Sequence, residues 1–223
     1  MPLPSSDQNA EPFVVAFVLG VTPGKWASIW NERMPRHPLE LRPSDATAAV
    51  AALLDGTVDA AFLRSVQSHE SLSSIELYIE QPVVVAPKDH ALEALEFATL
   101  ADLLDENLLD SSDVAADVEL VAANVGVAIM PQSVARALSR RDVVARPLGD
   151  AATTGVSLVW PTARQSEAVD ELIGIVRGRT ANSSRADAAP VKLSASQKAA
   201  AKKARAVAAG RSGKPGSGAK KRR

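Results

Sequence analysis

A glycine-containing turn near the N-terminus has residue types that can bind phosphate. Gly20 and Gly24 flank this turn, and Lys25 follows directly. The phosphate loop of nucleotide-hydrolysing proteins has four residues between its glycines and a Ser or Thr after the lysine. Here three residues separate the glycines and Trp26 follows Lys25, so the spacing excludes such a loop. Two interpretations stay open: Thr22 and Gly24 only form the turn, or they open a helix whose N-terminal amides bind an anion.

No other motif indicates catalysis or a metal. His37, His69 and His90 are far apart and follow no metal-ligand spacing, and the chain has no cysteine. No serine lies in a Gly-x-Ser-x-Gly nucleophile turn. We therefore expect a protein that is not an enzyme and that has neither a metal nor a cofactor.

The charge is divided very unevenly along the chain. Residues 177–223 contain 14 Lys and Arg residues but one acid, a net charge of +13, whereas residues 1–176 have a net charge of −14. The basic tail has no aromatic residue and few large apolar ones, so we expect it to be disordered. It can release counterions from DNA without reading the sequence, or it can fold against its own acidic body. The tail residues expected to contact nucleic acid are Lys198, Lys202, Lys203, Arg205, Lys220, Lys221, Arg222 and Arg223.

Composition also bears on the compartment. Absence of cysteine fits a reducing cytosol. The longest apolar run, residues 13–21, is nine residues long, whereas a membrane helix needs about 20. We expect a cytoplasmic protein without a membrane segment.

Strands and helices are expected to alternate through residues 13–177. Ser44 or Asp45 can cap a helix that Gly56 ends, and Thr99 can cap a short one. The opening strand–helix–strand–helix–strand order predicts a parallel sheet. Trp26 and Trp30, four residues apart on one helix, are expected either in the core or at the rim of a cleft. Apolar periodicity predicts strands at 13–21, 39–42, 58–63, 75–79, 83–86, 127–130, 143–148 and 156–160, and helices from 23, 45, 99, 114–125, 131–138 and 165–177.

Four segments in this order resemble the effector-binding domain of the LysR-type transcriptional regulators. The first strand ends in Gly-Val-Thr-Pro at residues 20–23. A helix ending at Gly56 precedes a strand containing Asp59-Ala60-Ala61. A strand led by Pro82 runs to His90-Ala91-Leu92, and Val121-Ala122 precede Gly126-Val127 and a strand ending at Pro131. The resemblance covers about residues 13–177.

The resemblance implies the two-lobed α/β fold of type 2 periplasmic binding proteins, with a shortened second lobe and a disordered basic tail. Lobe one would comprise residues 13–84 and 157–177, lobe two residues 85–156, and the tail residues 178–223. The chain would cross between the lobes near residues 83–87 and 156–160. In this arrangement a ligand lies between the lobes, near strand ends and helix N-termini.

The resemblance also implies a binding site for a small effector, which we expect to be a carboxylate. Arg64 follows a strand where some relatives have a site arginine and can pair with a carboxylate bidentately. Asp45 would repel an anion, and Ala46 stands where several relatives have a hydroxyl, so a site that has lost its ligand is the alternative. The residues to which the resemblance and the helix starts assign ligand contacts are Thr22, Gly24, Ser44, Asp45, Thr47 and Arg64.

Two departures from the family pattern affect the expected function. Only about 12 residues precede the first strand, so we expect no winged helix-turn-helix of the family kind here. Only residues 110–113 stand where relatives have roughly another strand–helix–strand unit. We expect a ligand-sensing domain in transcription regulation, which can form a homodimer, with sequence-independent nucleic-acid binding through the tail as the alternative.

Overall fold

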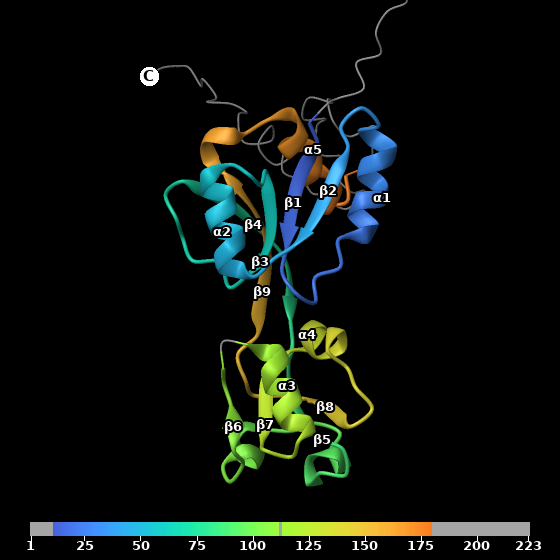
Figure 1. Cartoon of the computed structure of the whole chain (residues 1–223), viewed down its shortest axis with the longest axis vertical. Coiled ribbons are helices and arrows are strands. Elements are labelled where there is room, and N and C mark those ends of the chain that lie inside the picture. The colour runs from blue at the N-terminus through green and yellow to red at the C-terminus, as the bar shows by residue number, and fades with distance from the viewer. Residues whose placement is uncertain (1–10, 112, 180–223) are drawn as a thin grey trace, which may run out of the picture. The chain divides into compact units, whose positions relative to one another are not determined.

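The computed structural model describes residues 11–111 and 113–179, and their strands form two sheets (Figure 1). Residues 180–223 of the basic tail, with the eight predicted nucleic-acid contacts, lie outside the described residues. The first sheet has the strand order β2-β1-β3-β9-β4. Its strands and helices are β1 (Phe13–Phe17), α1 (Gly24–Arg33), β2 (Leu39–Pro43), α2 (Ala46–Asp55), β3 (Ala60–Arg64), β4 (Leu72–Glu80), β9 (Thr154–Pro161) and α5 (Glu167–Val176).

The first three strands of this sheet follow the predicted parallel arrangement. β1 pairs in parallel with β2 on one side and with β3 on the other. β9 is antiparallel to both β3 and β4, which the parallel prediction did not include. β3 and β4 therefore run in the same direction on either side of β9, and residues 65–71, which connect them, form no helix.

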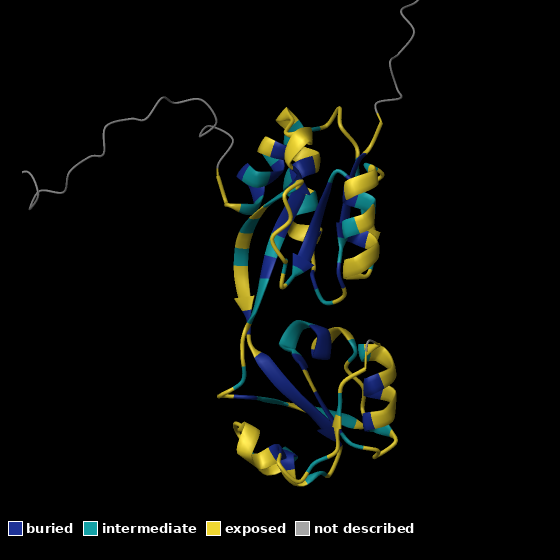
Figure 2. Ribbon diagram, turned by 90° about the vertical axis from the view of Figure 1, so that its left-hand side faces the viewer, coloured by how far each residue is buried: buried dark blue, intermediate teal, exposed yellow. Residues whose placement is uncertain are grey.

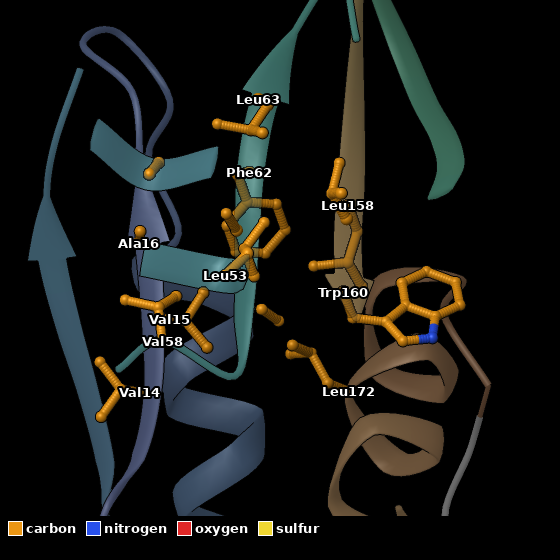
Figure 3. Close-up of a cluster of buried hydrophobic side chains, with 14 of the residues drawn as sticks. Val14, Val15, Ala16, Leu53, Val58, Phe62, Leu63, Leu158, Trp160 and Leu172 are labelled. Carbon is orange, nitrogen blue, oxygen red and sulfur yellow. The ribbon is translucent and has the colours of Figure 1, made fainter. Parts of the chain in front are cut away.

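Helices cover both faces of the first sheet. Phe13 and Phe62 stack on Trp30 and Trp26 of α1, with ring centroids 4.8 Å and 4.7 Å apart. Trp30 is fully buried, which confirms its predicted place in the core. Side chains alternate between the faces of a strand, so Leu63 lies on the opposite face, toward α2. Figure 3 shows the buried side chains of this core, including Leu158 of β9 and Leu172 of α5.

The second sheet has the strand order β6-β7-β5-β8 and a core on each face. β5 is buried along its whole length (Figure 2). Val83 and Val85 face α3 and α4, whereas Val84 and Ala86 face the two short helices η1 and η2. Its elements are β5 (Pro82–Pro87), η1 (Ala91–Ala94), η2 (Leu100–Leu103), β6 (Leu108–Leu109), α3 (Val114–Ala122), β7 (Val127–Pro131), α4 (Gln132–Ala137) and β8 (Val143–Pro147).

The chain passes between the sheets at other residues than expected. Residues 83–87 lie wholly in the second sheet and residues 156–160 wholly in the first. Pro82 and Val83 already pair with Pro131 and Met130, so the first passage is at Gln81. The second passage comprises residues 148–153, between β8 and β9.

Two helix predictions differ from the structure in their ends or type. α3 ends at Ala122 and not at residue 125, because Asn124 takes a left-handed conformation with φ of 60°. Gly126, which directly follows the predicted helix of residues 114–125, allows a close approach, since a Cβ there would collide with the backbone oxygen of Asn107. The helix that Thr99 caps is a single 3-10 turn, and no pattern in the sequence predicted η1, β6 or the 3-10 turn η3 (Thr162–Arg164).

No helix among residues 11–111 and 113–179 is long and apolar enough to cross a membrane.

Candidate functional site

The six residues predicted to bind a ligand follow three neighbouring strands. Phe17, the last residue of β1, pairs with Pro43 of β2 and with Phe62 of β3. The carboxyl ends of these parallel strands therefore meet at one edge of the first sheet. In open α/β sheets, ligands bind at this kind of edge. The six residues thus lie at or just beyond this edge, although they differ in what they contact, and their binding of a ligand stays a prediction.

The N-terminus of α1 has no side-chain cap. Pro23 precedes the helix, and among residues 11–111 and 113–179 no side chain accepts a hydrogen bond from the first amides of the helix. Thr22 and Gly24 are exposed, and Thr22 makes no side-chain hydrogen bond within the described part of the chain. Free amides and the positive end of a helix dipole attract anions. This helix start can therefore receive a carboxylate.

The N-terminus of α2 already has a carboxylate. The Asp45 side chain accepts a hydrogen bond of 2.8 Å from the Ala48 amide, so Asp45 is the cap that the sequence left open between two residues. The Ser44 hydroxyl donates to the backbone oxygen of Asp45, at 3.1 Å. Asp45 supplies the negative charge that the helix dipole favours and would repel a second anion there. Thr47 is exposed on the first turn of the helix.

Arg64 is held in a network at the end of β3. Its Nε donates to Glu80 Oε2 at 2.5 Å and its Nη2 donates to Glu80 Oε1 at 3.3 Å. Nη2 also donates to the Ser133 hydroxyl at 2.7 Å, and Nη1 donates to the backbone oxygen of Leu19 at 2.5 Å. The Arg64 side chain is 14% exposed and that of Glu80 5%. Arg64 thus joins both sheets and the β1–α1 loop, and its charge is compensated from within the protein.

Three residues that complete this network carried no sequence signal for it. Glu80 is the last residue of β4, where an acid usually indicates an exposed position. Ser133 was recognised only as part of a helix start. Gly20 has φ of 85°, and a Cβ there would lie 2.8 Å from Ser133 Oγ and 2.9 Å from Arg64 Nη2. The loop therefore approaches the Arg64 network closely because residue 20 is glycine.

Tyr78 reports on the electrostatics beside this network. The Tyr78 side chain is only partly buried, and this partial burial raises the pKa of its hydroxyl. The charge of Glu80 raises the pKa further, and the charge of Arg64 opposes the shift. Because the charges of Arg64 and Glu80 act in opposite directions, partial burial is the leading cause of the raised pKa of Tyr78.

A pocket of about 340 Å³ adjoins the same edge of the sheet. Ala46, Thr47 and Val50 of α2 form one side of it, and residues 63–69 with Leu72 form the rest. Thr47 and Arg64 line it, whereas Thr22, Gly24, Ser44 and Asp45 do not. Within residues 11–111 and 113–179, no cluster of three or more His, Cys, Asp or Glu side chains could hold a metal ion.

Comparison with known proteins identifies the relatives of this fold. The LysR substrate binding domain family matches residues 24–115 and 109–181, which is more than half of the chain. The effector-binding domain of a BenM variant is 21% identical, with a TM-score of 0.64 and coverage of 75% of this chain and 94% of that chain. The BenM effector-binding domain with its effector benzoate is 20% identical, with a TM-score of 0.63 and coverage of 76% and 92%.

A second regulator has the same fold. A mutant of the OxyR regulatory domain from Pseudomonas aeruginosa is 19% identical, with a TM-score of 0.61 and coverage of 76% of this chain and 97% of that chain. No curated protein matched the sequence. These structures confirm the expected two-sheet fold of type 2 periplasmic-binding-protein-like effector-binding domains, and with the family match they show that the chain belongs to the LysR substrate-binding domain family.

Proposed function

We propose that this domain senses a small carboxylate and that the carboxylate binds at the N-terminus of α1. The observation that carries the proposal is that α1 starts without a side-chain cap beside the exposed hydroxyl of Thr22. The competing start of α2 has the Asp45 carboxylate on its amides, and Arg64 is paired with Glu80. Benzoate, the effector of the similar BenM domain, belongs to the proposed ligand class.

Thermal melting of the full chain with a panel of aliphatic and aromatic carboxylates tests this proposal. A ligand that binds the native state raises the melting temperature, so we expect at least one carboxylate to do so. Thr22→Val keeps the shape of the side chain but removes a hydroxyl that can bond a charged group, which is worth about 1.5–3 kcal/mol. Thr22→Val should therefore weaken binding by about 10- to 100-fold.

Thr153→Val is the matched control, because Thr153 is exposed and lies in the passage between β8 and β9. It should keep the affinity of the native chain. Melting temperatures that no compound raises would contradict the proposal and would support the alternative that the site has lost its ligand.

We retain a homodimer as a prediction. β4 is the edge strand of the first sheet and exposes Tyr78 and Ile79, and an exposed edge strand can pair with a second chain. The mass of one chain is 23.4 kDa. Light scattering of the full chain should give twice this mass. A mass that stays at one chain up to high concentration contradicts the dimer.

Sequence-independent binding of nucleic acid by the tail is a second candidate function. The charge of +13 on residues 177–223 supports it. Affinity for DNA should fall with salt by about 0.9 log units per log unit of salt for each phosphate contacted. Deleting residues 180–223 should abolish retention of DNA at low salt. Equal retention by the shortened chain would exclude the tail as the binding element.

A further inference from the structure

We propose that the pocket between α2 and residues 63–72 is a separate binding site for a small, uncharged and mainly apolar molecule. Its volume of about 340 Å³ lies within the range of about 300–1,000 Å³ that is usual for small-molecule sites. The site is distinct from the start of α1, since neither Thr22 nor Gly24 lines it. This inference goes beyond carboxylate sensing and does not depend on it.

The wall of the pocket is largely apolar. Val50 of α2, Leu63 of β3, Val66 and Leu72 contribute aliphatic side chains, and Ala46 adds a methyl group. The four aliphatic side chains belong to the core of the first sheet or pack against it, whereas Ala46 is exposed. Filling this space with an apolar body removes hydrocarbon surface from water, worth about 25 cal/mol per Å². The wall therefore favours an aromatic or branched aliphatic body.

The charge of the lining argues for a neutral ligand. Arg64 and His69 are the ionisable residues among those that line the pocket. The buried carboxylate of Glu80 compensates Arg64 through two hydrogen bonds. Two further hydrogen bonds, to Leu19 and Ser133, use most of the remaining donors of the guanidinium group. A carboxylate in the pocket would therefore find the charge of Arg64 already compensated by Glu80.

Polar side chains at the pocket are available for a neutral partner. Within the described part of the chain, the side chains of Thr47, Gln67 and Ser68 make no hydrogen bonds. His69 Nδ1 accepts a hydrogen bond of 3.1 Å from the Ser71 amide, so the proton of a neutral His69 is on Nε2, which is then a donor. Amide, hydroxyl and imidazole groups of this kind can bond an amide, alcohol or ring N–H of a ligand.

The backbone of one residue that lines the pocket, Ser65, is strained. Ser65 has φ of 46°, in the left-handed region that residues other than glycine rarely adopt. Its amide donates to the backbone oxygen of Gly155 at 3.1 Å, which holds this conformation. The strained residue turns the chain from β3 into the loop that closes one side of the pocket. Strain of this kind concentrates at ligand sites.

Titration of the full chain with neutral and charged probes, followed by amide NMR, tests the site. The probes are benzamide, benzyl alcohol and indole, each compared with benzoate at equal concentration. We expect at least one neutral probe to shift the amides of residues 46–50 and 65–69 and to bind there at least tenfold more tightly than benzoate. Ser68→Trp, which places a large side chain in the pocket from its exposed loop, should abolish these shifts.

Ser139→Trp is the matched control, since Ser139 is also exposed but follows α4 in the second sheet. It should bind the neutral probes as the native chain does. The proposal is overturned if no neutral probe shifts residues 46–50 and 65–69, if benzoate binds there as tightly, or if Ser68→Trp leaves the shifts unchanged. Carboxylate binding at α1 is read separately, from residues 18–25 and the Thr22→Val variant, so either site can fail without the other.

Discussion

The ion pair between Arg64 and Glu80 links the end of β3 to the end of β4. Both side chains are largely buried and the pairing is bidentate. A buried pair adds little stability compared with apolar residues, but removal of one partner leaves an uncompensated charge. Substitutions of Arg64 and Glu80 should therefore have strongly non-additive effects on the free energy of unfolding.

Glu80→Gln should lower the free energy of unfolding by about 3 kcal/mol, because Arg64 then stays buried without a carboxylate. Adding Arg64→Met should restore part of the loss, so that urea unfolding of the two single variants and the double variant gives a clear coupling energy. The pair between Arg42 and Glu40 is also of Arg and Glu but is exposed, and its coupling should be much smaller. Additive effects at Arg64 and Glu80 would show that the pair is not a unit.

Gly20 and Gly24 lie at the two ends of one loop but have different surroundings. A Cβ at Gly20 meets Ser133 and Arg64 and faces a positive φ, whereas a Cβ at Gly24 has nothing within 4 Å. Gly20→Ala should destabilise the protein by more than about 1 kcal/mol, since alanine is strained at this φ. Gly24→Ala, measured in the same urea experiment, should be neutral or stabilising because alanine favours the helix. Equal effects would contradict the close approach at Gly20.

At the scale of elements, the Asp45 side chain caps α2, and we expect it to contribute to stability and not to ligand binding. Asp45→Ala removes the hydrogen bond to the Ala48 amide and should lower the free energy of unfolding by about 1 kcal/mol. Asp45→Asn keeps an equally good cap without the charge, so it should leave stability nearly unchanged. Chemical unfolding compares the two variants, and a loss as large in Asp45→Asn would show that charge, not capping, is the contribution of Asp45.

The short helix η2 gives a prediction of pH dependence. Asp102 accepts hydrogen bonds from the hydroxyl and the amide of Thr99, and these bonds, the hydroxyl's first, lower the pKa of its carboxyl group. A carboxylate with a lowered pKa stabilises the fold above its unfolded-state pKa of about 3.9, and the stabilisation is lost as the pH falls through the lower folded value.

NMR titration of the Asp102 carboxyl should therefore give a midpoint below that of an unfolded aspartate. Thr99→Val removes the hydroxyl donor and should move the midpoint upward. A midpoint that is the same in both proteins would contradict the hydrogen bond as the cause.

Element predictions succeeded where a local pattern decides the structure. The apolar period of α5, the Gly56 stop of α2 and the strand of residues 83–86 all reappear within a few residues. The η1 turn and the two-residue strand β6 were missed, because tertiary packing and not local pattern decides such short elements. The end of α3 was placed too late, since Asn124 in place of glycine adopts the left-handed conformation.

At the scale of the whole molecule, the order of the elements indicates which residues share one edge of the first sheet, but not which partners their side chains have. Strand order and parallel pairing follow from alternating elements, so the edge that carries Thr22, Thr47 and Arg64 could be foreseen. The pairing of Arg64 with Glu80 could not, because β4 is brought to this edge only by its antiparallel pairing with β9. Contacts between residues 16 positions apart on separate strands have no local signature.

We propose above all that this LysR-type domain binds a carboxylate at the start of α1. The most direct measurement is amide NMR of the full chain titrated with the panel of aliphatic and aromatic carboxylates. We expect at least one compound to cause saturable shifts of amide signals. These shifts should be largest at residues 18–25 and strongly reduced in Thr22→Val. The absence of saturable shifts across the panel, or shifts that are unaffected by Thr22→Val, would contradict the proposal.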